Sequence, residues 1–167
     1  MKDTGFTVPD DQLHRFGPMY TRFRIAIEPV EESPFRDPYR FQSGGGGLIS
    51  TVEDYKHFGE MLMDKGQYNG VQVLTEQSVS LMTQNQLADG IRNIDGDGFG
   101  YGFEVQLESN QQSPATEYTW DGIGSTHFWA YPKEEIFVIA LSQHMPFIPV
   151  LKYTLRPKIY RSLNIEY

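Results

Sequence analysis

The hydrophobic pattern changes at Phe99, and this change constrains the fold more than any other feature of the sequence. Three later runs are rich in β-branched and aromatic residues: 99–107, 117–132 and 135–143. The short segment from Pro132 to Glu135 joins the last two runs as a hairpin. The stretch from Val138 to Leu141 is apolar at every position, as expected for a sheet covered on both faces. The sequence therefore predicts a three-stranded antiparallel meander.

Helical periodicity appears on both sides of this meander. Three helices are predicted, over residues 52–65, 76–85 and 148–165. Thr51 and Thr75 are suitable N-caps for the first two, and Asp54 completes a T-x-x-D capping pattern with Thr51. Pro157 must kink the last helix or start a new segment. Together these elements indicate an α+β fold, an antiparallel β-sheet with flanking helices.

The first 42 residues are rich in Pro, Arg, Asp and aromatic residues. They predict a long wrapping segment with one short strand near residues 23–27. Four consecutive glycines follow at 44–47, and composition favours a flexible linker and a close-approach loop about equally. We expect one domain with three parts: residues 1–47 as wrapping segment and glycine-rich turn, 48–97 as helical part, and 98–167 as sheet and closing helix.

Composition excludes several classes of function. The chain has 167 residues, a formal net charge of -8 and no Lys/Arg-rich run, so nucleic acid is not an expected partner. It has no cysteine, and its four histidines lack metal-ligand spacing, so we expect neither a metal site nor a cofactor. The DGDG stretch at 95–98 is expected to be a polar turn, because the rest of a calcium-binding loop is missing. No apolar run is long enough to cross a membrane, which predicts a soluble protein.

Two glycines, Gly122 and Gly124, interrupt the aromatic run at 117–132. Glycine weakens a strand and often marks a bulge or a place where a ligand approaches the backbone. One interpretation is that Trp120, Phe128 and Trp129 are sheet core and the glycines only ease the twist of the sheet. The other is that this strand forms one wall of an active site. A lone Gly-x-Gly pattern favours the first interpretation.

Several stretches, in order, resemble the serine β-lactamase/penicillin-binding-protein-like family, in particular the C-terminal half of its class C-like β-lactamase and esterase branch. The matching stretches are DTGFTVP near the start, SGGGGLISTVEDYKHFGEMLMDKGQYNGVQVLTEQSVSLMTQNQL, GFGYGFEV, TWDGIGSTHFWAYPKEE and IFVIALSQ. The resemblance covers essentially the whole chain. It implies the C-terminal part of a β-lactamase/transpeptidase-like fold.

The same resemblance implies a chemistry that this chain carries only in part. The family uses a Ser nucleophile in S-x-x-K, a Tyr in Y-x-N/S, and a K-T-G or W-x-G strand that lends a backbone N–H to the oxyanion hole. No serine here has Lys three residues later, and no tyrosine has Asn two residues later. Tyr160 and Ser162 match Y-x-S in spelling alone, within the terminal helix. We therefore expect no catalytic residue in this chain and no activity from the chain alone.

The third element of the family, the strand that lends an N–H to the oxyanion hole, matches the sequence TWDGIG. Trp120 matches the site-facing position, Gly122 the motif glycine, and Ile123 supplies the oxyanion N–H, while Gly124 leaves room for substrate. Asp121 departs from the usual Gly or Thr and would place an uncompensated charge near the site. Ser125 departs from the usual Gly. His127 has no identifiable carboxylate partner and is expected on the strand surface rather than as a base.

Two functions follow from this sequence. The first is the C-terminal portion of a serine hydrolase that acts on an ester or β-lactam through an acyl-serine intermediate. The second is a non-catalytic binding or assembly module built from half of the fold. Uncovered apolar faces predict a homo-oligomer, or packing against the missing half. The compartment stays open between bacterial cytoplasm and periplasm.

Overall fold

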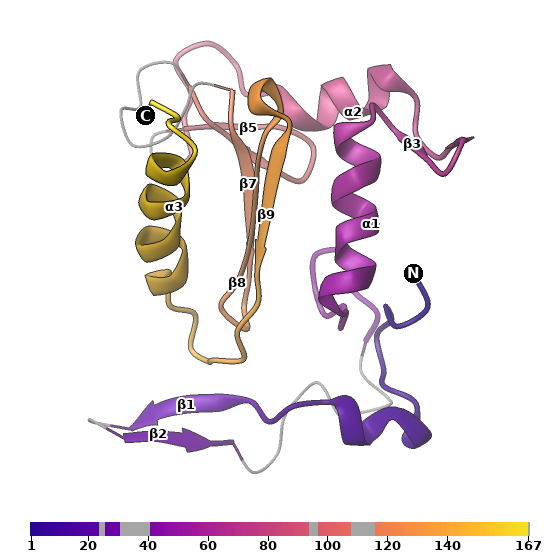
Figure 1. Ribbon diagram of the computed structural model, residues 1–167, viewed down its shortest axis with the longest axis vertical. Helices are drawn as coiled ribbons and strands as arrows, with labels where there is room; N and C mark the ends of the chain where they lie inside the picture. The colour runs from indigo at the N-terminus through magenta and orange to yellow at the C-terminus, as the bar shows by residue number, and fades with distance from the viewer. Residues whose placement is uncertain (24–25, 31–40, 94–96, 108–115, 167) are drawn as a thin grey trace.

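The computed structural model describes the chain except residues 24–25, 31–40, 94–96, 108–115 and 167 (Figure 1). The segments at the N-terminal end are a 3-10 turn Asp10–Arg15, β1 Tyr20–Phe23 and β2 Ala26–Pro29. The helical part holds α1 Val52–Met63, β3 Gln67–Tyr68, β4 Val71–Gln72 and α2 Glu76–Thr83. The remaining elements are β5 Gly98–Phe99, β6 Glu104–Val105, β7 Tyr118–Gly122, β8 Thr126–Tyr131, a 3-10 turn Pro132–Glu134, β9 Ile136–Ala140 and α3 Val150–Ser162.

The main sheet is antiparallel throughout and has the order β5-β6-β7-β8-β9. The predicted meander is confirmed, with five strands in place of three. The run at 99–107 divides into β5 and β6 because the chain turns between Gly100 and Gly102. The Gly100 N–H donates to the Phe103 C=O over 2.8 Å, and Gly102 has a φ of +96°. The run at 117–132 divides because it folds back on itself after Gly122. The predicted hairpin through Pro132 is confirmed by the β8–β9 register.

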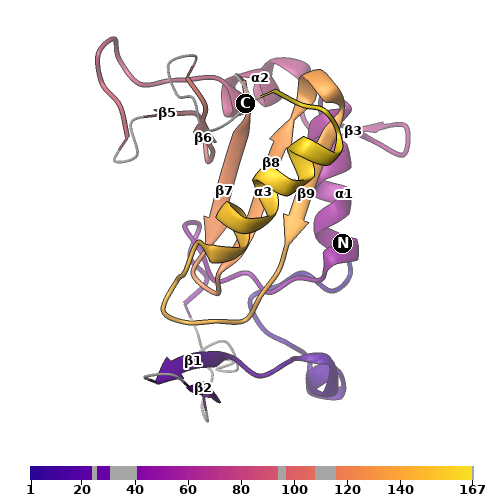
Figure 2. The same ribbon diagram turned by 60° about the vertical axis from the view of Figure 1, so that its left-hand side comes forward.

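Helices cover both faces of the sheet. Figure 1 shows α3 on one side and α1 on the other, and Figure 2 shows α3 crossing in front of β7, β8 and β9. Phe128 and Ala130 of β8 pack toward α1 and α2, whereas Trp129 and Tyr131 pack toward Tyr160 of α3. Strand β9 also contributes to both clusters, which confirms the prediction of a sheet covered on both faces.

The predicted caps of the first two helices are confirmed. The Thr51 hydroxyl accepts the Asp54 N–H over 3.2 Å, and the Thr75 hydroxyl accepts the Ser78 N–H over 3.0 Å. Both helices end about two residues before the predicted limits. Pro157 lies inside α3 and starts no new segment.

The Asp54 side chain binds the N-terminal segment of the chain; its described hydrogen bonds are not the return contact to Thr51 that a capping box would have. Its carboxylate accepts the Asp3 N–H over 2.7 Å and the Thr4 hydroxyl over 2.9 Å. The first residues of the chain are therefore fastened to the start of α1. The same region is paired to residues after the glycine run, because Gly5 and Ile49 exchange backbone hydrogen bonds of 3.1 and 2.8 Å.

The glycine run forms a turn that begins at Ser43, whose C=O accepts the Gly46 N–H over 3.4 Å. No described atom lies within 4 Å of the point where a Cβ would stand on Gly44 or Gly46. The described residues therefore give no support to the close-approach interpretation at these two positions.

The N-terminal region forms a hairpin, β1–β2, where the sequence predicted a single strand. It lies beyond the end of the main sheet at which β7 and β8 join (Figure 1). Tyr20 anchors it: its N–H donates to the Gln143 C=O over 2.8 Å, and its C=O accepts the Met145 N–H over 2.8 Å. The loop after β9 is thus held between the hairpin and the sheet.

Candidate active-site edge

The β7–β8 hairpin turns through Ile123, Gly124 and Ser125. The Ser125 N–H donates to the Gly122 C=O over 2.9 Å, and Ser125 has a φ of 61°. This is the common three-residue hairpin loop, a type I turn followed by a left-handed residue. The two glycines are therefore not in a strand interior as expected: Gly122 ends β7 and Gly124 lies in the turn.

Only one of the two glycines has a close neighbour, and that neighbour is a side-chain hydroxyl that would have to rotate away from a Cβ. A Cβ on Gly122 would stand 2.2 Å from Thr126 Oγ1, too close for any side chain without a shift. A Cβ on Gly124 would stand 3.6 Å from Met19 Cε, which is ordinary contact. That side of Gly124 is occupied by the N-terminal segment. Its expected role as space for substrate stays a prediction.

Strand β7 is paired on both sides for only part of its length. Strand β8 pairs with all five residues of β7, but β6 pairs only with Tyr118 and Thr119. Among the residues that the structure describes, nothing pairs with β7 on the β6 side beyond Thr119. The end of β7 that carries Trp120, Asp121 and Gly122 is therefore an open edge.

The backbone groups at this edge follow from strand alternation. The Glu117 C=O accepts the Gln106 N–H over 2.8 Å, so Glu117 faces the β6 side. Gly122 faces the β8 side, because its C=O accepts from the hairpin turn. Alternate residues of a strand direct their backbone groups to opposite edges. Asp121 consequently directs its N–H and C=O to the open edge. The Ile123 N–H points the same way, because it lies opposite the Gly122 C=O in their shared trans peptide. This is where the resemblance requires an oxyanion donor.

Trp120 lies on the α1 face of the sheet and is 48% exposed. Its ring meets Phe99 edge-on, with ring centroids 5.3 Å apart. Phe128 and Trp129 are buried as core residues, but Trp120 is not. The sheet-core interpretation therefore holds for Phe128 and Trp129 and is wrong for Trp120, which together with Phe99 forms an aromatic wall beside the open edge.

Asp121 and His127 correct two expectations. His127 is not a surface residue: it is 1% exposed, and its Nδ1 lies 2.9 Å from Asp121 Oδ1. Asp121 is not uncompensated: its Oδ2 lies 3.3 Å from Lys152 Nζ. The sequence alone does not identify Asp121 as the partner of His127, because which residues of β7 and β8 face each other depends on where the hairpin turns. A hairpin that turns at 123–125 places residues 121 and 127 opposite each other.

The Asp121 carboxyl is held in its ionised form. Burial alone would raise its pKa, but the hydrogen bond with His127 and the positive charge of Lys152 outweigh burial, and the pKa lies below its ordinary value. The group therefore carries a negative charge at neutral pH and accepts hydrogen bonds at both oxygens. Its side chain belongs to the α3 side of the sheet, away from Trp120.

A second buried polar contact ties α3 to Glu117, the residue just before β7. Glu117 is 2% exposed, and its Oε1 lies 2.9 Å from Arg156 Nη2. The Tyr160 hydroxyl donates to its Oε2. The Arg156 guanidinium also lies over the Trp129 ring, 5.7 Å from its centroid. Lys152, Arg156 and Tyr160 are spaced four residues apart, so one face of α3 makes all these contacts.

Ser125 fastens the hairpin turn to the loop after β9. It is 1% exposed; its hydroxyl donates to the His144 C=O over 2.9 Å and accepts the Ile148 N–H over 3.0 Å. These bonds explain why a serine occupies a left-handed position where glycine is usual.

Replacing Ser125 with alanine should lower the free energy of unfolding by about 2 kcal/mol, because two hydrogen bonds are lost and the left-handed backbone remains. Ser125→Gly is the matched comparison, since it loses the same bonds but relieves about 1 kcal/mol of backbone strain. Urea unfolding should therefore rank wild type above Gly, and Gly above Ala. Equal stability of all three proteins would contradict the assigned role.

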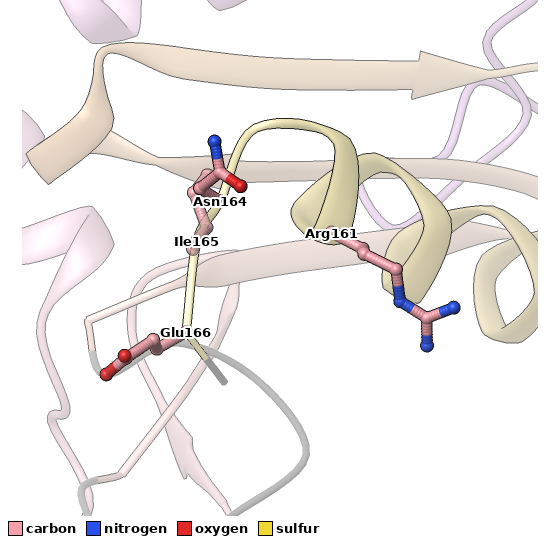
Figure 3. Close-up of a pocket in the computed structure, with 4 residues that line it drawn as sticks. All are labelled: Arg161, Asn164, Ile165 and Glu166. Carbon is pink, nitrogen blue, oxygen red and sulfur yellow. The ribbon is translucent and has the colours of Figure 1, made fainter.

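A surface hollow beside the end of α3 is lined by Arg161, Asn164, Ile165 and Glu166. Figure 3 shows the Arg161 and Glu166 side chains pointing away from each other. Within the described residues, no group of three or more His, Asp or Glu side chains is placed to hold a metal ion. None of the described helices is long and apolar enough to cross a membrane.

Known proteins have sequences related to this one. A family model described as Beta-lactamase matches residues 1–156. The protein Rv1367c of Mycobacterium tuberculosis H37Rv is 32% identical, over 90% of this chain and 41% of the relative. The uncharacterized protein MT1414 of the CDC 1551 strain gives the same values. The chain thus spans less than half the length of these relatives.

Solved structures agree at the level of the fold. Simvastatin synthase (LovD) from Aspergillus terreus superposes with a TM-score of 0.79 at 19% identity, over 95% of this chain and 46% of that one. EstCE1, described as a hydrolase with promiscuous acyltransferase activity, gives 0.77 at 20% identity, over 94% and 46%. The octameric penicillin-binding protein homologue from Pyrococcus abyssi gives 0.64 at 15%, over 98% and 34%. Because the family model matches nearly the whole sequence and the fold agrees, the chain belongs to the beta-lactamase family.

Proposed function

We propose that this chain supplies the substrate-binding strand of a serine acyl hydrolase or acyltransferase. The observation that supports the proposal is the open edge of β7, where the family's oxyanion-strand motif coincides with backbone groups of Asp121 and Ile123 that no described strand pairs on the β6 side. The S-x-x-K pair is absent from these 167 residues. The nucleophile therefore has to come from another segment, and the site is complete only when that segment packs against the edge.

The chemistry then follows the acyl-serine route. The Ser hydroxyl adds to the ester carbonyl while the Lys takes its proton. The Ile123 N–H donates to the oxyanion that forms. When the tetrahedral adduct collapses, the ester C–O bond breaks, the alcohol leaves with the proton that the Lys had taken, and an acyl-serine remains. Water, or a second alcohol, then attacks the acyl-serine and regenerates the hydroxyl.

A neutral ester fits the edge better than a β-lactam. A β-lactam antibiotic carries a carboxylate, which calls for a cation beside the strand. Trp120 stands where the resemblance would otherwise place Lys, and its described ring neighbour is Phe99. Lys152, the basic residue in contact with β7 at this end, is bound to Asp121 on the α3 side. LovD and EstCE1, whose described activities are synthase and hydrolase or acyltransferase, lend support to this choice.

The missing segment is also the partner that we propose for the exposed apolar side chains. Trp120, Ile123 and Leu48 are 48%, 59% and 59% exposed, and Phe41 is 83% exposed. Half of a two-part fold would leave such residues uncovered. Association of two copies of the chain is the competing arrangement, and light scattering separates it from a monomer that binds the other half.

The test compares the chain alone with a chimera in which the unmatched portion of Rv1367c supplies the missing half. The chain alone should turn over neither p-nitrophenyl butyrate nor nitrocefin. The chimera should hydrolyse the ester and leave nitrocefin intact, and Trp120→Ala should weaken its ester hydrolysis. Turnover by the isolated chain above a Trp120→Ala control, or preference of the chimera for nitrocefin, would contradict the proposal.

A further inference from the structure

Asp121 occupies the centre of the open edge and also the centre of a buried polar cluster. Its backbone N–H and C=O face the edge, by the alternation argued above. Its side chain contacts two residues on the α3 side: Oδ1 lies 2.9 Å from His127 Nδ1, and Oδ2 lies 3.3 Å from Lys152 Nζ. With a partner at each oxygen, the carboxylate cannot rotate without breaking a charge-assisted hydrogen bond.

The cluster is costly to bury, and its cost argues for a purpose beyond stability. His127 Nε2 is buried and has no hydrogen-bond partner among the described residues. The Lys152 side chain is only 10% exposed. An unpaired buried nitrogen and a buried ion pair are usually neutral or unfavourable for stability compared with apolar packing. Residues that break local rules of this kind are concentrated at functional sites.

We propose that His127 and Lys152 are positioning residues that act through Asp121 to fix the backbone donors of the open edge. They hold the Asp121 side chain from behind, so that the Asp121 and Ile123 N–H groups keep one direction when a substrate carbonyl arrives. The inference rests on the proposed function of the edge. It adds residues from β8 and α3 that touch no substrate but set the geometry of the oxyanion donor.

The first experiment uses the 167-residue chain itself, labelled with ¹⁵N. Relaxation-dispersion NMR should find the amides of residues 121–123 in one conformation in wild type and exchanging between conformations in Lys152→Met. Lys152→Arg should restore the single conformation, because it keeps a cation beside Asp121. Lys158→Met is the matched control, since Lys158 is exposed on the same helix. Asp121→Asn, which keeps the shape but loses the charge, replaces Lys152→Met if that variant does not fold.

Two results would overturn the inference. One is an unchanged dispersion profile at residues 121–123 in both Lys152→Met and Asp121→Asn. The other is equal exchange broadening at core strand positions such as Trp129 and Phe137, which would indicate general loosening of the sheet.

The second experiment measures ester hydrolysis by the chimera. Lys152→Met should lower kcat by about tenfold with little change in KM, because misplacement of a donor weakens transition-state binding. Lys152→Arg should recover most of kcat. A rise in KM at constant kcat would contradict the positioning role. An inactive wild-type chimera would count against the proposed function alone, and the NMR result would then decide this inference.

Discussion

Replacing Ile123 with proline should lower kcat of the chimera for ester hydrolysis by about 100- to 1000-fold, the usual loss for one oxyanion donor. The substitution deletes the backbone N–H that faces the open edge and leaves KM nearly unchanged, because the donor acts mainly on the transition state. Steady-state kinetics with p-nitrophenyl butyrate give both constants. A fall in kcat of less than about threefold would remove Ile123 from the proposed mechanism.

Proline is suited to this position for structural reasons. Ile123 is the second residue of the turn closed by the Ser125-to-Gly122 hydrogen bond, and proline is favoured there in type I turns. The preceding Gly122 is in a strand, which is compatible with a following proline. The Ile123 side chain is 59% exposed in this chain, and any packing that it gains against the supplied half is removed equally in the alanine control. Ile123→Ala is the matched control: it removes the same side chain but keeps the N–H, and it should retain kcat.

The sequence was sufficient to predict the elements whose signals are local. The caps at Thr51 and Thr75, the hairpin through Pro132 and the two-faced apolar strand depend on residues within a few positions of each other. The strand count was wrong because two of the predicted runs each contain a turn, one between Gly100 and Gly102 and one after Gly122. A three-residue turn with serine in the left-handed position has no glycine at its usual place.

The polar side of the candidate site could not be predicted, because it depends on long-range packing. Asp121 and His127 become neighbours only once the turn position is known. Lys152 of α3, which contacts Asp121, is 31 residues away from it in the sequence. Glu117 and Arg156 meet for the same reason, through the way α3 crosses the sheet (Figure 2). The charge on Asp121, which the sequence predicted to be uncompensated, is therefore paired with Lys152 and hydrogen-bonded to His127.

Raising the pH from 4.5 to about 7 should lower the free energy of unfolding of the chain by about 3 kcal/mol through Glu117 alone. Burial is the largest cause of the rise in the pKa of this carboxyl from 4.5 to about 7, and the negative charges of Asp97 and Glu104 also raise it. The positive charges of Arg156 and Lys152 lower this pKa but do not offset burial. The raised value means that the folded state binds the proton more tightly than the unfolded state. Stability from this group is therefore complete below the unfolded pKa of 4.5 and is lost as the pH rises through the folded pKa.

Urea unfolding at a series of pH values measures this slope, and Glu117→Gln provides the comparison. The amide keeps the shape of the side chain but does not titrate, so its stability should be nearly level between pH 4.5 and 7. Asp121 does not interfere in this window, because its pKa is lowered and its contribution is lost only below about 4. A stability difference between wild type and Glu117→Gln that stays constant, or moves in favour of wild type, over the window would show that the pKa of Glu117 is not raised in the folded state. In that case the charges of Arg156 and Lys152 would offset burial, and Glu117 would form an ion pair with Arg156 over most of the window rather than only as the pH approaches 7.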